Sequence, residues 1–349
     1  MDWGYTNARI RGMKSQLLDH HTLDTLILQP DLISLINELE KTPYREDIIA
    51  ARGKYTDLAC IEHALRDNFT RTFRKILGFV RNEEAEQYIR IFLHRWDVQN
   101  IKTILRGKNI HVTNDEIRDC LVPAGEMDEA TLTELVRQTD VRAVIDLLAT
   151  WRIPYAKPLT EGFPAYAKSG DLSVLECALD RYYYADSLNS VKAPSVNHTM
   201  IREILATEID VLNLRTVMRM IHDKVSPGDA APFLIEGGRT FDAKKLDNLL
   251  GLHSTDEVIT AISTTKYHFT GTAQDPGIRR EKISVIERQL ERFLVQQGTK
   301  LFRADPLSVA SLIAYFWAKY NEITNIRIIS RCKTADFPIE HLREELVYV

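Results

Sequence analysis

The chain has 349 residues, of which 44% are hydrophobic and 27% charged, with a formal net charge of −4 and a pI near 6.2. This composition is typical of a globular protein with room for two or three cores, and it lacks the basic footprint that nucleic-acid binding needs. The four cysteines stand apart from one another, which predicts neither a disulfide framework nor a zinc site and indicates a reduced, intracellular protein.

The N-terminal residues contain no apolar segment of the kind that a secretory signal carries, so we expect none. The longest apolar stretch, residues 307–318, is shorter than the roughly 18 to 20 residues that a spanning helix needs. We therefore expect no transmembrane segment, which leaves docking onto a membrane protein open.

Helical periodicity runs through almost the whole chain, and no sustained alternation with hairpin turns predicts a sheet. Apolar residues recur at helical spacing over residues 57–79, 84–108 and 282–302, and the second of these helices is expected to stop at Gly107 and Asn109. Breaks are expected where Pro, Gly and Ser gather, at residues 157–173, 190–197, 225–232 and 270–277. The last of these is the strongest candidate for a linker. The expected fold class is all-α.

One helical phrase occurs three times: RWDVQNIKTILRGK, EIDVLNLRTVMR and YNEITNIRIISRCK. Their asparagines, Asn100, Asn213 and Asn325, follow one another at almost equal intervals. A second phrase carries Glu62, Glu176 and Glu287, each of which precedes its asparagine by roughly 38 residues. Two markers that keep one spacing three times predict an internal repeat of about 112 residues.

Further residues keep the same register. Gly125 and Gly238 follow their asparagines at one and the same interval, and Tyr155 and Tyr267 follow at about 55 residues. A fainter copy around Asn7 leads to Tyr44, so the chain is expected to start and stop part-way through a unit. The predicted divisions are a partial repeat at 1–54 that closes with the C-terminal unit, then repeats at 55–160, 161–275 and 276–349 (truncated).

The repeated helix is expected to bury one apolar stripe. Three residues before each asparagine stands an acid that falls toward this stripe: Asp97, Asp210 and Glu322. A buried carboxylate is costly unless it is paired, so we expect each to have a fixed basic or backbone donor. The favoured interpretation of the asparagines is that they join helix to helix through buried amide hydrogen bonds; contact with a ligand is the alternative.

Basic residues lie on the opposite face, two and six positions after each asparagine: Lys102 and Arg106, Arg215 and Arg219, Arg327 and Arg331. A solvated helix face is the ordinary interpretation. The sharper hypothesis is that three similar domains surround an axis, so that the three pairs line a central cavity and contact an acidic or polar partner.

No catalytic constellation stands out. Gly53 and Lys54 lack the upstream glycine of a phosphate loop, and His20 and His21 point apart on a helix. The acids of residues 82–86 are more typical of a helix N-terminus than of a metal site, and Gly237 and Gly238 are expected at a helix end. We therefore expect no catalytic, cofactor or metal site, and no small-molecule substrate.

The chain resembles the central-stalk subunit of rotary V-type and A-type ATPases, which is known as the C subunit in archaeal and bacterial enzymes and as the d subunit in eukaryotic ones. YTNARIRGMKSQLL at residues 5–18 and YFWAKYNEITNIRIISRCK at 315–333 carry the resemblance at the two ends, and it extends over the whole chain. Cys332 departs from the glycine frequent at that position.

This resemblance implies three helical domains in a funnel with pseudo-threefold symmetry, seated on the proteolipid ring of the membrane and receiving the central shaft subunits (D/F type). It further implies a non-catalytic, rigid adaptor at the cytoplasmic face that transmits torque for ion transport or ATP synthesis. The alternative functions are a helical scaffold in another complex and an all-helical hydrolase. Proton or sodium coupling is a property of the ring.

Overall fold

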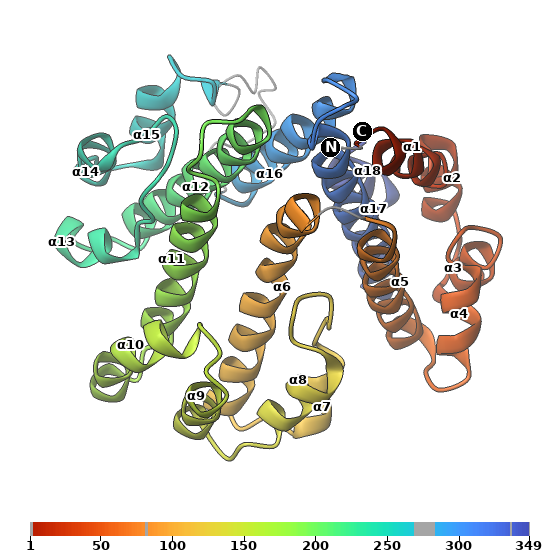
Figure 1. Cartoon of the computed structure of the whole chain (residues 1–349), viewed down its shortest axis with the longest axis horizontal. Coiled ribbons are helices and arrows are strands. Elements are labelled where there is room, and N and C mark those ends of the chain that lie inside the picture. Colours follow the sequence, from red (N-terminus) through yellow and green to blue (C-terminus); the bar gives the residue numbers. More distant parts are fainter. Residues whose placement is uncertain (1–2, 81–82, 269–282, 336, 349) are drawn as a thin grey trace. The chain divides into compact units, whose positions relative to one another are not determined.

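Helices make up most of the part of the chain that the structure describes. The computed structural model describes residues 3–80, 83–268, 283–335 and 337–348, is 75% helical and has no strand in these ranges, which confirms the all-α prediction (Figure 1). Two compact units make up the chain, one from residues 1–138 with 298–349 and one from residues 139–297. The four-part division by sequence repeats remains a prediction.

The first unit is built on long helices from both ends of the sequence. Its N-terminal part contains α1 (Trp3–Lys14), α2 (His20–Ile27), α3 (Leu32–Leu39), α4 (Arg45–Arg52), α5 (Asp57–Phe79), α6 (Glu83–Asn109), α7 (Asn114–Asp119) and α8 (Glu129–Val136). Its C-terminal part contains η3 (Leu301–Arg303), α17 (Ala310–Thr334) and α18 (Ile339–Glu345).

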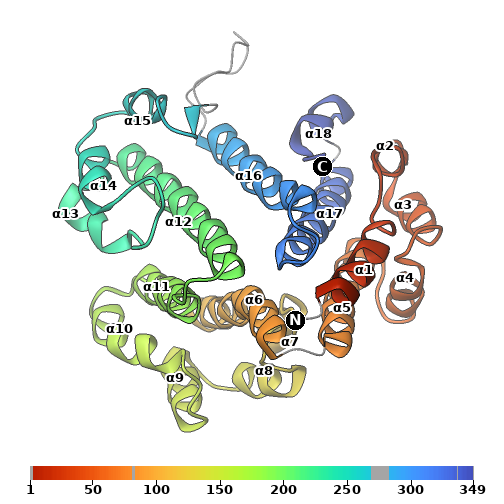
Figure 2. The same ribbon diagram turned by 45° about the horizontal axis from the view of Figure 1, so that its top comes forward.

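Aromatic side chains hold α5, α6 and α17 together. The Phe316 ring of α17 lies 5.4 Å from the rings of both Phe73 on α5 and Phe92 on α6. All three side chains are buried, and such tilted aromatic pairs add to the free energy gained by burial. The short helices α3 and α4 pack on α5 beside this core, as Figure 2 shows.

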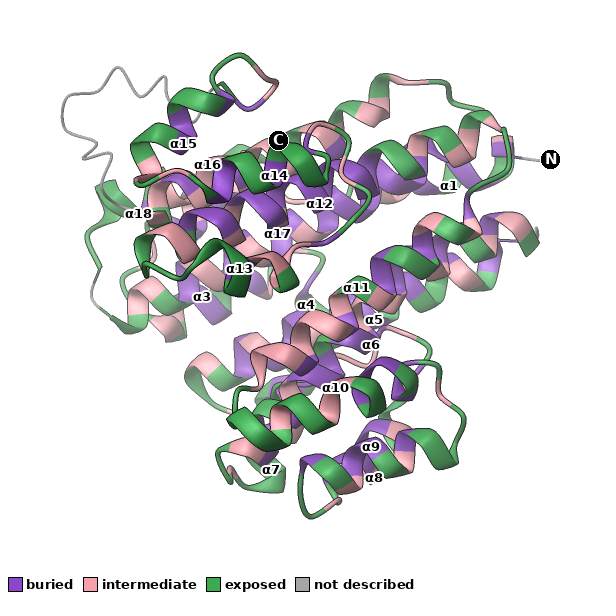
Figure 3. Cartoon of the chain, turned by 90° about the vertical axis from the view of Figure 1, so that its left-hand side faces the viewer, coloured by how far each residue is buried: buried purple, intermediate pink, exposed green. Residues whose placement is uncertain are grey.

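The second unit contains α9 (Val141–Thr150), α10 (Ala156–Ser169), α11 (Ser173–Ser190), α12 (Val196–His222), α13 (Pro227–Ala230), η1 (Ala231–Phe233), α14 (Ala243–Leu250) and α15 (Thr255–Ile262), and α16 (Ile283–Lys300) begins in it. In its core, Val217 and Met218 of α12 pack in one cluster with Val258 of α15, with Leu290 of α16 and with Tyr267, which follows α15. Buried residues run along much of α12, as they do along α17 in the first unit (Figure 3).

One predicted break is wrong. Most of residues 157–173 form α10, with Pro164 inside the helix, where the sequence predicts an irregular segment. Pro164 is exposed, while the opposite face of α10 packs on α11. A Cβ at Gly162 would lie 3.2 Å from Leu175 of α11, so this glycine permits close packing of the two helices. Tertiary packing therefore outweighs the local helix-breaking signals.

Other boundaries follow the prediction more closely. The break at 190–197 separates α11 from α12, and α6 ends at Asn109 as expected. Gly107 remains inside α6, where a Cβ would lie 2.4 Å from the Ile117 side chain. The segment 225–232 forms α13 and most of η1. The predicted linker at 270–277 lies outside the described residues.

None of the helices in the described ranges combines the length and the hydropathy of a membrane span.

Candidate functional site

The repeated asparagines bind loops, not helices. In the first unit, Asn100 donates its Nδ2 to the carbonyl of Val122 at 2.7 Å and accepts the amide N–H of the same residue at 2.8 Å. Asn325 makes the same pair with Val347 at 2.9 and 3.2 Å. Each partner lies 22 residues after its asparagine. The expected helix-to-helix tie is thus corrected: the side-chain amide matches both polar groups of one loop residue.

The second unit contains the same arrangement. Asn213 donates to the carbonyl of Ile235 and accepts its amide N–H, both at 2.8 Å, again 22 residues ahead. The fainter copy differs, because Asn7 donates to the carbonyls of Pro306 and Ser308, far ahead in the sequence. The asparagine therefore fixes a loop against a long helix wherever the full repeat is present.

The acids three residues earlier fix the next part of the same loops. Asp97 accepts the amide N–H groups of Glu126 at 2.9 Å and Met127 at 3.0 Å. In the second unit, Asp210 accepts the N–H of Thr240 at 2.9 Å and the hydroxyl of Tyr267 at 3.0 Å. The expected donors are present, and the closing tyrosine is one of them.

The repeated glycines make room for these acids. A Cβ at Gly125 would lie 2.0 Å from the nearer oxygen of Asp97, and one at Gly238 would lie 2.5 Å from that of Asp210. Gly237 and Gly238 lie in a loop after η1, so their expected place at a helix end is wrong. Gly237 has a φ of 102°, which favours glycine, but Gly238 is needed for the close approach of the carboxylate.

Glu322 is bound differently. It accepts the hydroxyl of Tyr44 at 2.6 Å, the ammonium of Lys319 at 2.8 Å, and the amide N–H of Leu18. Lys319 also donates to the Tyr44 hydroxyl at 2.9 Å. Burial and the nearby Glu322 carboxylate raise the pKa of Tyr44, so its hydroxyl stays a donor.

The Asp97 carboxyl is buried, which disfavours its charged form. Burial raises the pKa of its carboxyl from 3.8 to about 6, although the hydrogen bonds from Glu126 and Met127 act to lower it. Glu126 lies beside it and pairs with Arg90 and His94, each at 3.2 Å. We call the asparagine and the acid of one repeat, with the groups that they bind, an anchor; the anchor at Asp97 therefore contains a carboxyl with a pKa of about 6.

Four of the six predicted partner-contact cations bind a repeated glutamate of their own unit. In the first unit, Glu62 accepts Arg327 at 2.7 Å and pairs with Arg331 at 2.8 Å. In the second unit, Arg219 binds both oxygens of Glu287, at 2.6 and 3.0 Å, and Arg215 lies 3.7 Å away. We call each of these glutamates with its two arginines a clasp.

The remaining repeat residues divide between core and surface. Lys102 is buried, so the expected solvated face is wrong at this position; Asn100, Ile101 and Lys102 are buried in succession because α6 is covered on more than one side. Arg106 is exposed and Glu176 is half-buried. A further contact of the six cations with a partner remains a prediction.

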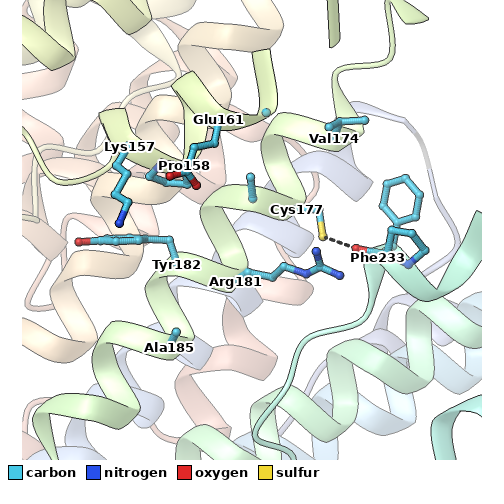
Figure 4. A pocket seen from close by; sticks show the side chains of 12 residues that line it. Lys157, Pro158, Glu161, Val174, Cys177, Arg181, Tyr182, Ala185 and Phe233 are labelled. Atoms are coloured by element: carbon cyan, nitrogen blue, oxygen red, sulfur yellow. Dashed lines mark hydrogen bonds between the residues drawn. The ribbon is translucent and has the colours of Figure 1, made fainter. Parts of the chain in front are cut away.

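The described residues contain no group of three His, Cys, Asp or Glu side chains that could hold a metal ion. The acids expected at a helix N-terminus lie there, with Glu83, Glu84 and Glu86 in the first turn of α6. A pocket of about 560 Å³ lies between α10 and α11, next to η1 (Figure 4). Its walls are mostly apolar, and sequence reasoning did not identify it.

A family model described as "ATP synthase (C/AC39) subunit" matches residues 6–345. The chain belongs to this family. C/AC39 subunits are structural components of the complex and not its catalytic subunits.

Curated relatives of the chain are named as the C subunit of A-type ATP synthase. The protein of Methanosarcina acetivorans is 29% identical, with 100% of this chain and 93% of the relative covered. The proteins of Methanococcoides burtonii and Halobacterium salinarum are also 29% identical, with 99% of this chain and 94% and 97% of the relatives covered. The similarity therefore spans nearly the full length of this chain and of each relative.

Proposed function

We propose that this chain is the subunit of an A-type rotary ATP synthase that joins the central shaft to the proteolipid ring, as a stiff, non-catalytic adaptor. The observation that carries the proposal is the match of nearly the whole chain to the C/AC39 family and to relatives named as the C subunit of A-type ATP synthase. The protein acts from the cytoplasmic face, as a peripheral part of the complex.

An adaptor that transmits torque must deform less than the parts it joins. The anchors suit this task, because the side-chain amide of each repeated asparagine binds both the carbonyl and the N–H of one loop residue. These asparagines are Asn100, Asn213 and Asn325. Buried, fully satisfied polar contacts of this kind specify one arrangement of loop on helix. The clasps at Glu62 and Glu287 add lateral ties between long helices.

The predicted shaft contact of the basic residues is part of this proposal. Arg106, Arg219 and Arg331 are exposed, and Arg219 and Arg331 extend from their clasps into solvent. An exposed arginine that shares one glutamate with a second arginine keeps donors for a further acidic group. Arg219 and Arg331 therefore suit a partner surface with carboxylates, while Glu287 and Glu62 keep them oriented.

The test is affinity purification of the tagged protein from membranes solubilised in mild detergent, with the co-purifying chains identified by mass spectrometry. We expect the proteolipid and the shaft subunits. Recovery of the protein alone, from membranes that retain intact ATPase, would refute the proposal and favour a scaffold of another complex. Binding of purified shaft should also weaken when Arg106, Arg219 and Arg331 are all changed to Ala.

A further inference from the structure

The helix hairpins α4–α5 and α10–α11 lie at corresponding positions of the repeated sequence. Side chains fill the space between the two helices in α4–α5, whereas α10–α11 has a pocket there. Tyr44 precedes α4 as Tyr155 precedes α10, and Glu62 lies on α5 as Glu176 lies on α11. Counting from these markers, Asp47 corresponds to Pro158. On the second helix of each hairpin, Asn68 corresponds to Tyr182 and Arg71 to Ala185.

In the first hairpin these positions form a compact polar cluster. Asp47 accepts the side-chain amide of Asn68 at 2.7 Å and the guanidinium of Arg71 at 2.6 Å. Arg71 also binds Glu46, and Asp47 is buried. The space between α4 and α5 is therefore occupied by the chain's own charged groups.

In the second hairpin the same positions line the pocket of about 560 Å³ between α10 and α11. Pro158, Tyr182 and Ala185 cannot form an ion pair (Figure 4). Gly162 and Ala178 also line the pocket, and neither has a side chain larger than a methyl group. Along α11 the lining runs from Val174 to Ala185, roughly 17 Å at helical rise, which is about three turns. The groove thus has the length and the apolar floor that a short helix needs.

The groove carries a surplus of positive charge at its edge. The Lys157 side chain has no hydrogen bond or ion pair within the described part of the chain, and the Arg181 side chain uses only its Nε, which donates to the carbonyl of Leu234 at 3.1 Å. Glu161, one turn from Lys157, is the single acid in the lining. Two cations beside one acid favour a partner with negative charge next to its apolar face.

We propose that the groove between α10 and α11 binds an amphipathic helix of another subunit of the same complex, with a bulky apolar side chain over Gly162 and Ala178 and a carboxylate toward Lys157 and Arg181. The inference rests on the proposed function, which supplies the complex. A helix that lays its apolar face in a groove is a common mode of recognition.

The test places a photoreactive benzoylphenylalanine at Ala185, which lines the groove, or at Thr160, an exposed residue of α10 that does not. Each variant is irradiated in the complex purified from membranes, and the cross-linked peptides are identified by mass spectrometry. We expect the probe at Ala185, and not the one at Thr160, to reach a helical segment of another subunit with Asp or Glu within one turn. A cross-link only to lipid, only within this chain, or to a segment without an acid would overturn the inference.

Charge reversal gives a second readout. Lys157→Glu with Arg181→Glu should lower the yield of that cross-link by about tenfold or more, since like charges would then face each other. Lys168→Glu, the same change on α10 away from the groove, should leave the yield unchanged; an equal loss in both variants would refute the assigned contact. Recovery of ring and shaft subunits is scored separately. Failure to recover them refutes the proposed function and this inference together, whereas recovery without the cross-link refutes the inference alone.

Discussion

Asp97 and Glu322 hold the same place in the repeated sequence, but different parts of the chain satisfy them. Asp97 is bound by two backbone N–H groups of the loop between α7 and α8, 29 and 30 residues ahead. Glu322 is bound by Leu18 and Tyr44, which lie 304 and 278 residues earlier. One anchor closes within a continuous stretch of chain, and the other joins the two ends of the sequence.

The comparison shows what an acid needs when its donors lie on a distant segment of the chain. Glutamate has one methylene more than aspartate and so reaches donors on a separate segment. Lys319 lies beside it, and both side chains are nearly fully buried, with 7% of the Lys319 surface and 5% of the Glu322 surface exposed. The anchor at Glu322 therefore depends on a matched buried ion pair, whereas the anchor at Asp97 depends on backbone donors and on the space that Gly125 leaves for the carboxylate.

The largest effect is expected when the anchor at Glu322, which joins the two ends of the sequence, is broken. Glu322→Ala should destabilise the fold by about 3 to 5 kcal/mol, because it leaves the buried Lys319 ammonium without its carboxylate. Chemical denaturation measures the loss, and hydrogen exchange should show faster opening of residues 18–44. Glu322→Gln combined with Lys319→Met should lose much less, since no charge stays buried; an equal loss would show that the ion pair is not what matters.

The second prediction concerns the continuous anchor and pH. Since the folded pKa of Asp97 is about 6 and its ordinary value is 3.8, the folded state binds the proton more tightly between these values. Stability from this residue should fall as the pH rises from about 4 to 6, by about 3 kcal/mol, and stay low above that. Denaturation curves of the wild type and Asp97→Asn across this range isolate the effect. Parallel pH dependence in the two proteins would contradict the assignment.

A third change tests the space reserved for Asp97. Gly125→Ala should destabilise by about 1 to 3 kcal/mol, because the new methyl group would lie 2.0 Å from a carboxylate oxygen. Gly78→Ala is the control, since nothing lies within 4 Å of a Cβ there and Gly78 is inside α5. Gly78 lies in the last turn of α5, so we expect that control to be as stable as the wild type or slightly more stable. Thermal unfolding of both variants is the measurement.

The smallest effect is expected at the clasp of Glu62 with Arg327 and Arg331. Glu62 is 24% exposed and Arg327 29% exposed, so their interaction is screened by solvent. Glu62→Gln should cost about 1 kcal/mol or less, and the cost should shrink in high salt. A double-mutant cycle with Arg327→Met measures the coupling directly. A coupling that persists unchanged at molar salt concentration would argue against an ion pair.

The sequence predicted more of the helices than of the contacts. Periodicity and repeat spacing located the long helices, and the spacing singled out the tyrosines that bind Asp210 and Glu322. The partners Val122, Ile235 and Val347 were out of reach, because they act through backbone groups that carry no sequence signal. Lys319 was missed for another reason: its role depends on Tyr44, which lies 275 residues away.

One usable signal lies in the helix caps. Each repeat carries a pair of helix-capping residues twelve positions apart: Asp19 and Asp31, Asp128 and Asp140, Asp242 and Ser254. A capping side chain followed by a short apolar run is readable from sequence, and three equal spacings would have located the paired short helices. The pocket between α10 and α11 could not be found this way, because the local signals at Gly162 and Pro164 suggested a break.

The joined anchor has a consequence for the order of events during synthesis. Residues 1–54 leave the ribosome long before α17, which supplies Glu322, Lys319 and Arg327. Until then α1–α4 lack the helix on which Tyr44 and Leu18 converge. α4 packs on α5, which follows it directly, but α1 and α2 pack on α17, so the first unit is completed only after α17 has been made.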